Sequence, residues 1–374
     1  MTLFDGSTVL ESIAAHEYGP DVSAVLALRQ KQVGLMERAY RSLFEHTGAD
    51  GLSVEERAFF AAHTATAVRE LSLAAHYRTL LDRQIETGIS APLDAAISER
   101  LTLLFQLMRL MTTSPSAVTR KNIADLERAG LTAAEIVTFA QLVAFVCYQA
   151  RVLHGLRLFS SQNDPAIATL EQDVCTPAIH RNFTLEVLRW QPWLQPVTLA
   201  SATPVQRSAL AECGVPPRDS AYFRVLAHAP AALRERTRLY NAILFDSGGL
   251  PRAEREFATV AVSRSNGCVY CASVHARRFA DLTKATAPID AFLRQGNVTG
   301  LSPRLQAIER FARRLSEAPG KLGRNDLEQL ENAGFTKLEI LDLIQATALF
   351  AWANRLMLTL GEPESALGET ANAQ

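Results

Sequence analysis

Apolar residues along this chain recur mainly at the spacing of an α-helix. In residues 25–44 they fit one helical face better than the alternation of a β-strand. The stretch from Glu56 to Leu81 is rich in alanine and contains neither glycine nor proline, so we expect one long helix there. Runs of β-branched residues bounded by glycine or proline are absent. The pattern therefore predicts an all-α protein.

Capping signals place several helix starts. Ser53 and Thr132 are each followed by a glutamate three residues later, which is the pattern of a capping box. The first 24 residues fit one helix plus a loop. Further helices are expected at about 93–111, 121–128 and 132–158, and the helical pattern continues from about 220 to 360.

The second half of the chain repeats the first. Residues 126–136 resemble residues 330–340, which follow 204 positions later. Residues 52–57 resemble residues 250–255, which follow 198 positions later, and a six-residue insertion in a loop accounts for the difference. Self-similarity over most of both halves indicates two copies of one helical unit.

We predict three parts in the 374 residues: a helical domain at 1–180, a linker at 181–218 and a second helical domain at 219–374. The linker region is richer in proline and tryptophan than the rest. Its residues Trp190 and Trp193 are expected to fix the linker to one of the domains.

Charge and composition exclude several classes of protein. The formal net charge is −1 and no block of like charge occurs, which argues against a nucleic-acid or membrane-surface partner. The first residues lack a secretory signal, and no apolar run reaches the length of a membrane span. Five cysteines in so long a chain do not make a disulfide scaffold. We expect a cytoplasmic protein with mostly reduced thiols.

The chemistry of the chain is concentrated around two cysteines of the second copy. Cys268, Cys271 and His275 have the spacing of one helical stripe. The pair Asn266-Gly267 breaks helices, so a new helix is expected to start at about Cys268, where the helix dipole favours a thiolate. A carboxylate, Glu256, lies twelve residues before Cys268. These groups could form a dithiol that is activated by a base and cycles through a disulfide.

The repeat supplies an internal control. At an offset of 198, none of the four reactive groups has a chemical equivalent in the first copy. Cys268, Cys271, His275 and Glu256 correspond there to Glu70, Leu73, Tyr77 and Ala58. The fold therefore does not need these groups for packing, and this favours a function confined to the second copy.

Glu256, the Cys-x-x-Cys pair at Cys268 and Cys271, and His275 together resemble the signature of the alkyl hydroperoxidase D-like proteins. These belong to the wider carboxymuconolactone decarboxylase superfamily. Residues 340–356 also resemble the closing helix of the peroxidase-related branch. The whole chain is similar to double-domain members, in which a degenerate domain precedes an active-looking one.

The resemblance implies an all-helical tandem repeat, a homo-oligomer, and a thiol-dependent peroxidase of antioxidant defence. In that scheme Cys271 is the peroxidatic thiolate, Cys268 is the resolving cysteine, and His275 with Glu256 forms the proton relay. The substrate would be a hydroperoxide and the reductant an external dithiol. Tyr270 stands where the best-studied members have a second histidine.

Other interpretations remain open. The two thiols could be ordinary buried residues, or the dithiol could serve as a redox sensor or disulfide reductase without fast peroxide turnover. A decarboxylase or lactone-processing enzyme is a third possibility, although such relatives generally lack the cysteine pair. A zinc site would need a fourth ligand, which no second Cys-x-x-Cys or histidine pair offers. No fingerprint of a nucleotide, flavin or nicotinamide cofactor occurs.

Several residues have structural explanations. Cys147, Cys175 and Cys213 lack a partner at a sensible spacing and are expected to be core or incidental residues. Arg355 has a counterpart in Arg151, which favours a structural role, such as a buried ion pair, over substrate contact.

Overall fold

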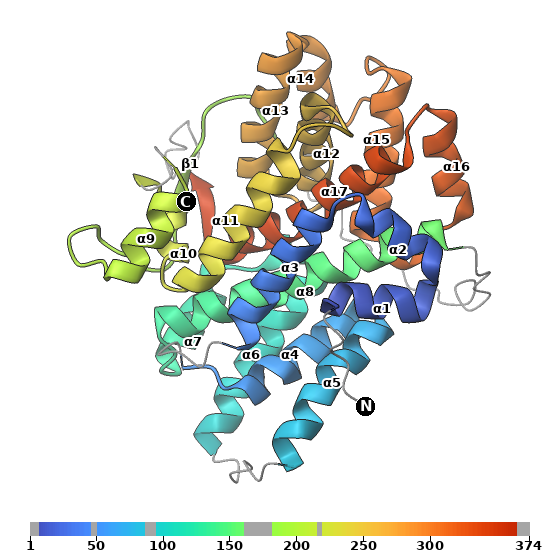
Figure 1. Ribbon diagram of the computed structural model, residues 1–374. Helices are drawn as coiled ribbons and strands as arrows, with labels where there is room; N and C mark the ends of the chain where they lie inside the picture. Colours follow the sequence, from blue (N-terminus) through green and yellow to red (C-terminus); the bar gives the residue numbers. More distant parts are fainter. Residues whose placement is uncertain (1–6, 46–50, 87–94, 161–181, 215–218, 365–374) are drawn as a thin grey trace.

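The structure is a computed structural model that describes residues 7–45, 51–86, 95–160, 182–214 and 219–364. Within these ranges the chain forms seventeen α-helices and two short β-strands (Figure 1). The all-α prediction is confirmed. The helices enclose one continuous apolar core to which both halves of the chain contribute.

The first half begins with two helices instead of the predicted helix plus loop. Helices α1 (Val9–Tyr18) and α2 (Pro20–Ala27) meet at Gly19, whose φ of 82° lies in the left-handed region. Proline at the first position of α2 fits the start of a helix. Helix α3 (Gln30–Phe44) therefore starts later than the pattern in residues 25–44 suggested.

The single helix predicted from Glu56 to Leu81 is wrong. The chain forms α4 (Val54–Ala67) and α5 (Leu71–Glu86), separated by a turn at which Arg69 has a φ of 59°. The corresponding turn in the second copy places Gly267 at a φ of 72°. An arginine in the left-handed region costs about 1 kcal/mol, so tertiary packing overrides local preference here. Because no glycine stands at this turn, the break was not predicted.

The remaining elements occur in the same order in both halves. The first half continues with α6 (Ala95–Thr113), η1 (Pro115–Ala117), α7 (Arg120–Arg128), α8 (Ala133–Leu156) and η2 (Arg157–Phe159). The second half contains α10 (Ala221–Leu226), α11 (Pro230–Phe245), α12 (Arg252–Ser265), α13 (Val269–Thr283), α14 (Thr286–Gln295), α15 (Pro303–Glu317), η5 (Pro319–Lys321), α16 (Arg324–Asn332) and α17 (Lys337–Thr359). Helices α3, α4, α5, α6, α7 and α8 thus match α11, α12, α13, α15, α16 and α17, as a tandem repeat requires.

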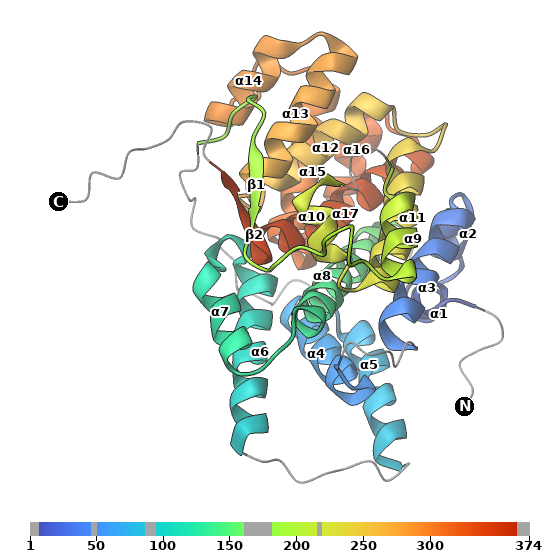
Figure 2. The same ribbon diagram turned by 90° about the vertical axis from the view of Figure 1, so that its left-hand side faces the viewer.

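The region between the copies is tied to the end of the chain. It contains β1 (Arg189–Pro192) and α9 (Pro204–Glu212), and β1 pairs antiparallel with β2 (Gly361–Glu364), as Figure 2 shows. Trp190 donates a hydrogen bond from Nε1 to the carbonyl of Met357 at 3.1 Å, which confirms that it fixes the linker. The predicted domain boundaries at 180 and 218 lie outside the described residues and stay predictions.

Helices α8 and α17 pack against each other at the centre of the molecule (Figure 1). Their contact is reciprocal. Trp352 of α17 donates to Gln141 Oε1 of α8 at 3.0 Å, and Tyr148 of α8 donates to Gln345 Oε1 of α17 at 2.7 Å. The two donors, Tyr148 and Trp352, correspond at the repeat distance of 204 residues, and so do the two acceptors, Gln141 and Gln345. The structure therefore contains a pseudo-twofold axis between the two copies.

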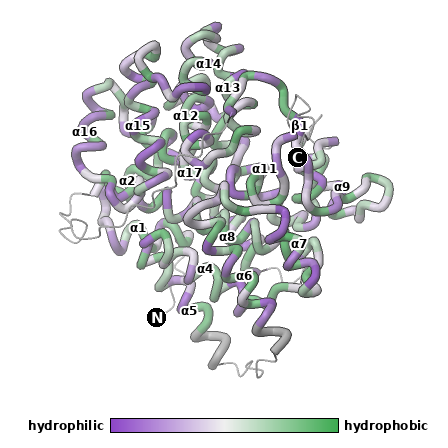
Figure 3. The backbone as a smooth tube through the Cα atoms, turned by 180° about the vertical axis from the view of Figure 1, so that it is seen from behind, coloured by the Kyte–Doolittle hydropathy of each residue, from purple (hydrophilic) through white to green (hydrophobic). Residues whose placement is uncertain are grey.

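Both central helices are buried over most of their length. The segment Ala133–Phe159 is long and apolar enough to cross a membrane by length and composition, and its most apolar window is entirely buried inside the protein. Such burial is typical of a core helix. Along outer helices such as α15 and α16, by contrast, polar stretches alternate with apolar ones (Figure 3).

The arginines at the repeat distance on these helices do not form the suggested ion pair. Arg151 Nη2 donates to the carbonyl of Ser316 at 2.9 Å, and Arg355 Nη2 donates to the carbonyl of Thr112 at 3.0 Å. Each guanidinium thus crosses to the other copy. Within the described residues neither arginine contacts a carboxylate at ion-pair distance.

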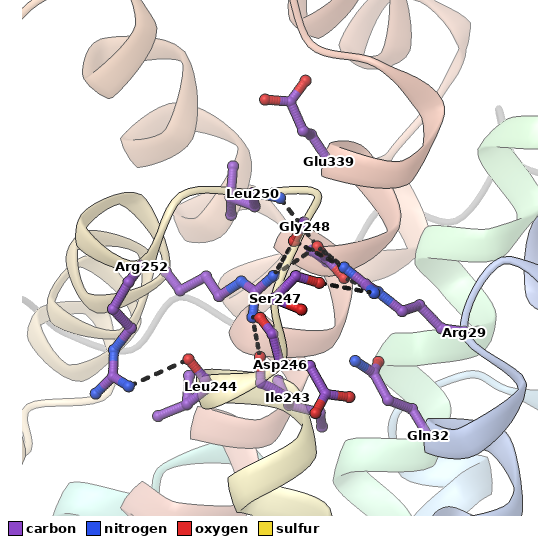
Figure 4. A network of polar contacts seen from close by, with 12 residues as sticks. Arg29, Gln32, Ile243, Leu244, Asp246, Ser247, Gly248, Leu250, Arg252 and Glu339 are labelled. Carbon is purple, nitrogen blue, oxygen red and sulfur yellow. Dashed lines mark hydrogen bonds and ion pairs between the residues drawn. The ribbon is translucent and has the colours of Figure 1, made fainter.

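A second connection between the copies holds the loop between α11 and α12, residues 246–251. Arg29 binds the buried carboxylate of Asp342 with Nε and Nη2, both at 2.7 Å, and reaches the carbonyl of Gly248 at 2.9 Å (Figure 4). Arg255 donates to the same carboxylate at 2.9 Å. A Cβ on the adjacent Gly249, whose φ is 64°, would lie 2.1 Å from Asp342 Oδ2. Only glycine fits at position 249 of this loop.

Removing this carboxylate should destabilise the fold. The Asp342→Ala variant leaves Arg255, which is 1% exposed, without its partner. Loss of one member of a buried ion pair typically costs about 3–5 kcal/mol. The free energy of unfolding in urea measures the change. The matched control is Asp290→Ala, which removes an exposed carboxylate from an i, i+4 pair with Arg294 and should change stability little. Equal effects of the two substitutions would show that the network does not stabilise the fold.

Candidate active site

The cysteine pair lies at the turn between α12 and α13. Cys268 is the N-cap residue of α13, which starts at Val269, as predicted. The backbone N–H of Cys268 donates to the carbonyl of Ser263 at 2.8 Å, and Gly267 provides the left-handed turn. Cys271 follows in the first turn of the helix, where the unpaired amides and the helix dipole favour an anion.

Glu256 and His275 are in direct contact. Residues 19 positions apart meet because α12 and α13 pack side by side, and His275 Nδ1 hydrogen-bonds Glu256 Oε2. The other carboxylate oxygen of Glu256 accepts a hydrogen bond from Arg252 Nε at 2.8 Å, one turn earlier on α12. Phe350 of α17 packs edge-on against the imidazole, with ring centroids 4.6 Å apart. Contacts with Glu256 and Phe350 thus hold the imidazole ring of His275 on two sides.

Burial and the neighbouring charges set the protonation states of Glu256 and His275. Burial alone would raise the pKa of Glu256, but the adjoining His275 and Arg252 outweigh it and bring the pKa to about 2. Burial of the imidazole lowers the pKa of His275, and Glu256 offsets this only in part. At neutral pH the carboxylate is therefore ionised and the imidazole neutral. Such a ring donates Nδ1–H to Glu256 and presents an unprotonated Nε2.

Cys271 and His275 line the same cavity. Its volume is about 260 Å³, and its wall is mostly aromatic and apolar. Cys268 does not contribute to the wall and is only 1% exposed, whereas Cys271 is 6% exposed. The structure therefore gives the two thiols different environments: one faces a cavity and the other lies behind it.

Two further residues of this cavity were not predicted from the sequence. The hydroxyl of Tyr222 is buried and has no hydrogen-bond partner among the described residues. Burial raises the pKa of Tyr222, and the charge of nearby Arg236 lowers it in part, while both cysteines act to raise it. The guanidinium of Arg236 lies 5.9 Å from the tyrosine ring centroid. Tyr222 comes from α10 and Arg236 from α11, and both are far along the chain from the cysteine motif. Their spacing in the sequence therefore did not indicate that they lie near the cysteines.

A polar trio anchors the cysteine turn to α17. Asn266 Nδ2 donates to Asn354 Oδ1 at 3.0 Å, and Asn354 Nδ2 donates to Ser263 Oγ at 3.1 Å. The first copy has apolar residues in all three places. Asn266, Asn354 and Ser263 correspond to Val68, Ala150 and Ala65. A comparison of the two copies of the repeat could have identified these three residues, because each is polar where its counterpart is apolar.

The equivalent space in the first copy is filled by aromatic packing. Tyr77, which corresponds to His275, is buried and donates its hydroxyl to Gln149. Its ring stacks on Phe44 with a centroid distance of 5.1 Å, and Tyr40 lies beside both. This copy is therefore a packed core at the place where the second copy holds its reactive groups.

The other cysteines lie apart from the pair. Cys147 is buried in the core on α8, and Cys213 is partly buried beside Thr237 on the wall of the 260 Å³ cavity. Cys175 lies outside the described residues. In the part of the chain that the structure describes, no three His, Cys, Asp or Glu side chains gather as metal ligands would.

Residues 230–314, which span α11 to α15 and hold all four predicted site residues, match the model of the carboxymuconolactone decarboxylase family. This part of the chain is similar to members of that family. Among solved structures the chain is similar to a peroxidase-related protein from Ralstonia eutropha described as an alkylhydroperoxidase AhpD core. The two are 27% identical, the match covers 48% of this chain and 94% of the other, and the TM-score is 0.41. No curated protein matches the chain.

Replacing Glu256 with glutamine should destabilise the protein at neutral pH and matter less in acid. The carboxyl has a pKa of about 2 in the fold against an ordinary value of 4.5, so its ionised form adds stability above about pH 4.5. This stability is lost as the pH falls towards 2, and it amounts to at most about 3 kcal/mol. Urea unfolding of wild type and Glu256→Gln from about pH 7 to about pH 3.5 measures it.

The control for this experiment is Glu328→Gln, which removes an exposed glutamate paired with Arg324. Its effect should not depend on pH. A difference between wild type and Glu256→Gln that stays constant or grows as the pH falls would contradict the depressed pKa.

Proposed function

We propose that this protein is a thiol-dependent peroxidase that reduces a hydroperoxide at Cys271. The observation that carries the proposal is the contact between Glu256 and His275 beside a cavity that Cys271 also lines. A neutral imidazole oriented by a carboxylate is the arrangement of a general base. The family domain and the likeness to a peroxidase-related protein support the same class of chemistry.

In the first step His275 takes the proton of the Cys271 thiol at Nε2, directly or through a water molecule, and Glu256 stabilises the resulting imidazolium. The thiolate attacks the distal oxygen of the hydroperoxide, so that an S–O bond forms and the O–O bond breaks. The alkoxide leaves with the proton that the imidazolium returns. The products are a cysteine sulfenic acid and an alcohol.

In the second step Cys268 attacks the sulfur of the sulfenic acid. An S–S bond forms, the S–O bond breaks, and the oxygen leaves as water. Cys268 lies three residues before Cys271 at the start of the same helix, so the disulfide closes a short loop. An external dithiol then reduces the disulfide by exchange, which oxidises the dithiol and restores both thiols.

The wall of the cavity supports an organic hydroperoxide as the substrate. Tyr240, Val274, Phe350 and Met357 offer apolar surface, while Tyr222 and Arg236 provide donors near the thiols. Burial of the alkyl part against this surface would add binding energy that hydrogen peroxide cannot gain. The hydroxyl of Tyr222, which lacks a partner within the described residues, is a suitable donor to a peroxide oxygen.

Substitution of either cysteine should abolish turnover. We expect Cys271→Ser and Cys268→Ser to reduce dithiol-dependent consumption of cumene hydroperoxide to background, because each removes a sulfur that the cycle needs. His275→Gln should lower the rate by about 10²–10⁴ while the protein stays folded, since a general base contributes about that factor. Peroxide consumption and circular dichroism measure the two properties.

The control is Cys147→Ala, a thiol of the first copy buried on α8, which should retain turnover. Full activity of Cys271→Ser would refute the proposed cycle. A wild-type protein that exchanges its disulfide with a dithiol but consumes no peroxide would establish the alternative, a disulfide reductase or redox sensor.

Filling the cavity should discriminate between substrates. Val274 is part of the wall between Cys271 and His275, so Val274→Trp is expected to lower kcat/KM for cumene hydroperoxide by at least about tenfold and to affect hydrogen peroxide less. Val205→Trp, at an exposed valine of α9, is the matched control and should change neither value. Equal losses for both peroxides in Val274→Trp would show that the cavity does not bind the alkyl group.

A further inference from the structure

A second cavity, with a volume of about 300 Å³, lies on the pseudo-twofold axis between the two copies. It shares no residue with the cavity that Cys271 lines. Its wall contains pairs of residues that correspond at the repeat distance of 204, which are Arg151 and Arg355, Thr112 and Ser316, and Pro115 and Pro319. Both copies therefore build this cavity together.

Arg151 and Arg355 are the central feature of its wall. They are only 4% and 2% exposed, and each donates to the carbonyl four residues earlier on its own helix and to one carbonyl of the other copy. The Nε groups of both have no hydrogen-bond partner among the described residues. His154, which is 1% exposed, also lines the cavity, and its Nδ1 lies 3.7 Å from the carboxylate of Glu70, beyond hydrogen-bond distance.

The buried Arg255, by contrast, has a compensating charge. Arg255 is as deeply buried as Arg355, and it is paired with the carboxylate of Asp342 at 2.9 Å. Carbonyl oxygens satisfy hydrogen bonds but do not neutralise a guanidinium. An uncompensated buried charge is costly, and two of them facing one cavity repel each other.

The electrostatics of the whole wall favour an anion. Five cationic and three carboxylate side chains line the cavity. Burial raises the pKa of Glu70 to about 7, so this carboxyl group is partly protonated at neutral pH, and burial also raises the pKa of Glu317. Burial, and next the charge of Arg355, lowers the pKa of Arg151 to about 9, which still leaves Arg151 protonated at neutral pH.

We propose that this cavity binds a small organic carboxylate between Arg151 and Arg355. A guanidinium presents several N–H donors in a planar fork that matches a carboxylate, and a bound anion would relieve the repulsion between the two arginines. Tyr18, Val68, Pro115 and Pro319 supply apolar surface for the rest of the ligand. Since a cavity of about 150 Å³ can hold benzene, this one accommodates an aromatic or short-chain acid.

The site differs in kind from the thiol centre. It needs no cysteine and requires the first copy, which supplies Arg151 and His154. The degenerate copy thus contributes residues to a second site that both copies build, and binding there does not depend on peroxide chemistry.

The test is isothermal titration calorimetry of the full-length wild-type chain with sodium benzoate, sodium succinate, benzamide and inorganic phosphate. We expect at least one of the two carboxylates to bind and benzamide, the neutral analogue of benzoate, not to bind. Binding of neither carboxylate at about 10 mM would overturn the proposal, as would binding of phosphate alone.

Variants then locate the site. Arg151→Met and Arg355→Met keep the length of the side chain and remove the charge, and each should raise the Kd of the bound carboxylate at least about tenfold. Arg294→Met, at an exposed arginine of α14 that pairs with Asp290 and does not line the cavity, is the matched control and should leave the Kd unchanged. Unchanged affinity in both Arg151→Met and Arg355→Met would overturn the assignment.

Circular dichroism checks the fold of each variant. If an arginine variant fails to fold, Thr113→Trp takes its place, because this partly exposed residue at the end of α6 lines the cavity and a tryptophan would fill it. Loss of carboxylate binding in folded Thr113→Trp supports the site, and retained binding contradicts it.

Discussion

The reciprocal contact between α8 and α17 is the constraint on which the rest of this structure depends. Each helix offers an aromatic donor and a glutamine acceptor to the other, so the two copies can meet in only one register. Gly155 lets the helices approach closely, since a Cβ there would lie 2.6 Å from Ile344. From the opposite side of α17, Asn354 holds the turn before Cys268. The helix that joins the copies thus also positions the candidate active site.

The two copies show how one fold is used with and without reactive groups. In the second copy the buried histidine is paired with a buried carboxylate, and that carboxylate also accepts a hydrogen bond from Arg252. In the first copy Tyr77 requires only one acceptor, Gln149, and otherwise packs against other rings. Buried polar groups demand partners, so reactive groups occur together with their supporting residues or not at all.

Much of the fold could be predicted from local patterns, and the failures have physical causes. Capping boxes at Ser53 and Thr132 fixed the starts of α4 and α8 because these interactions are local. The break at Arg69 was missed because packing forces a left-handed residue where the chain has no glycine. The contact of Glu256 with His275 was expected from their resemblance to a known motif. Tyr222 and Asn354 were not, because only the tertiary fold brings them to the cysteine turn.

The bond of Arg29 to Asp342 has a consequence for how this protein can be divided. Arg29 lies before α3 in the first copy, whereas Asp342 and the loop it secures belong to the second. A fragment cut out at the linker would lose this cation and also expose the apolar seam of α17. We therefore expect the two halves to fold together as one unit, despite the duplicated pattern of the sequence.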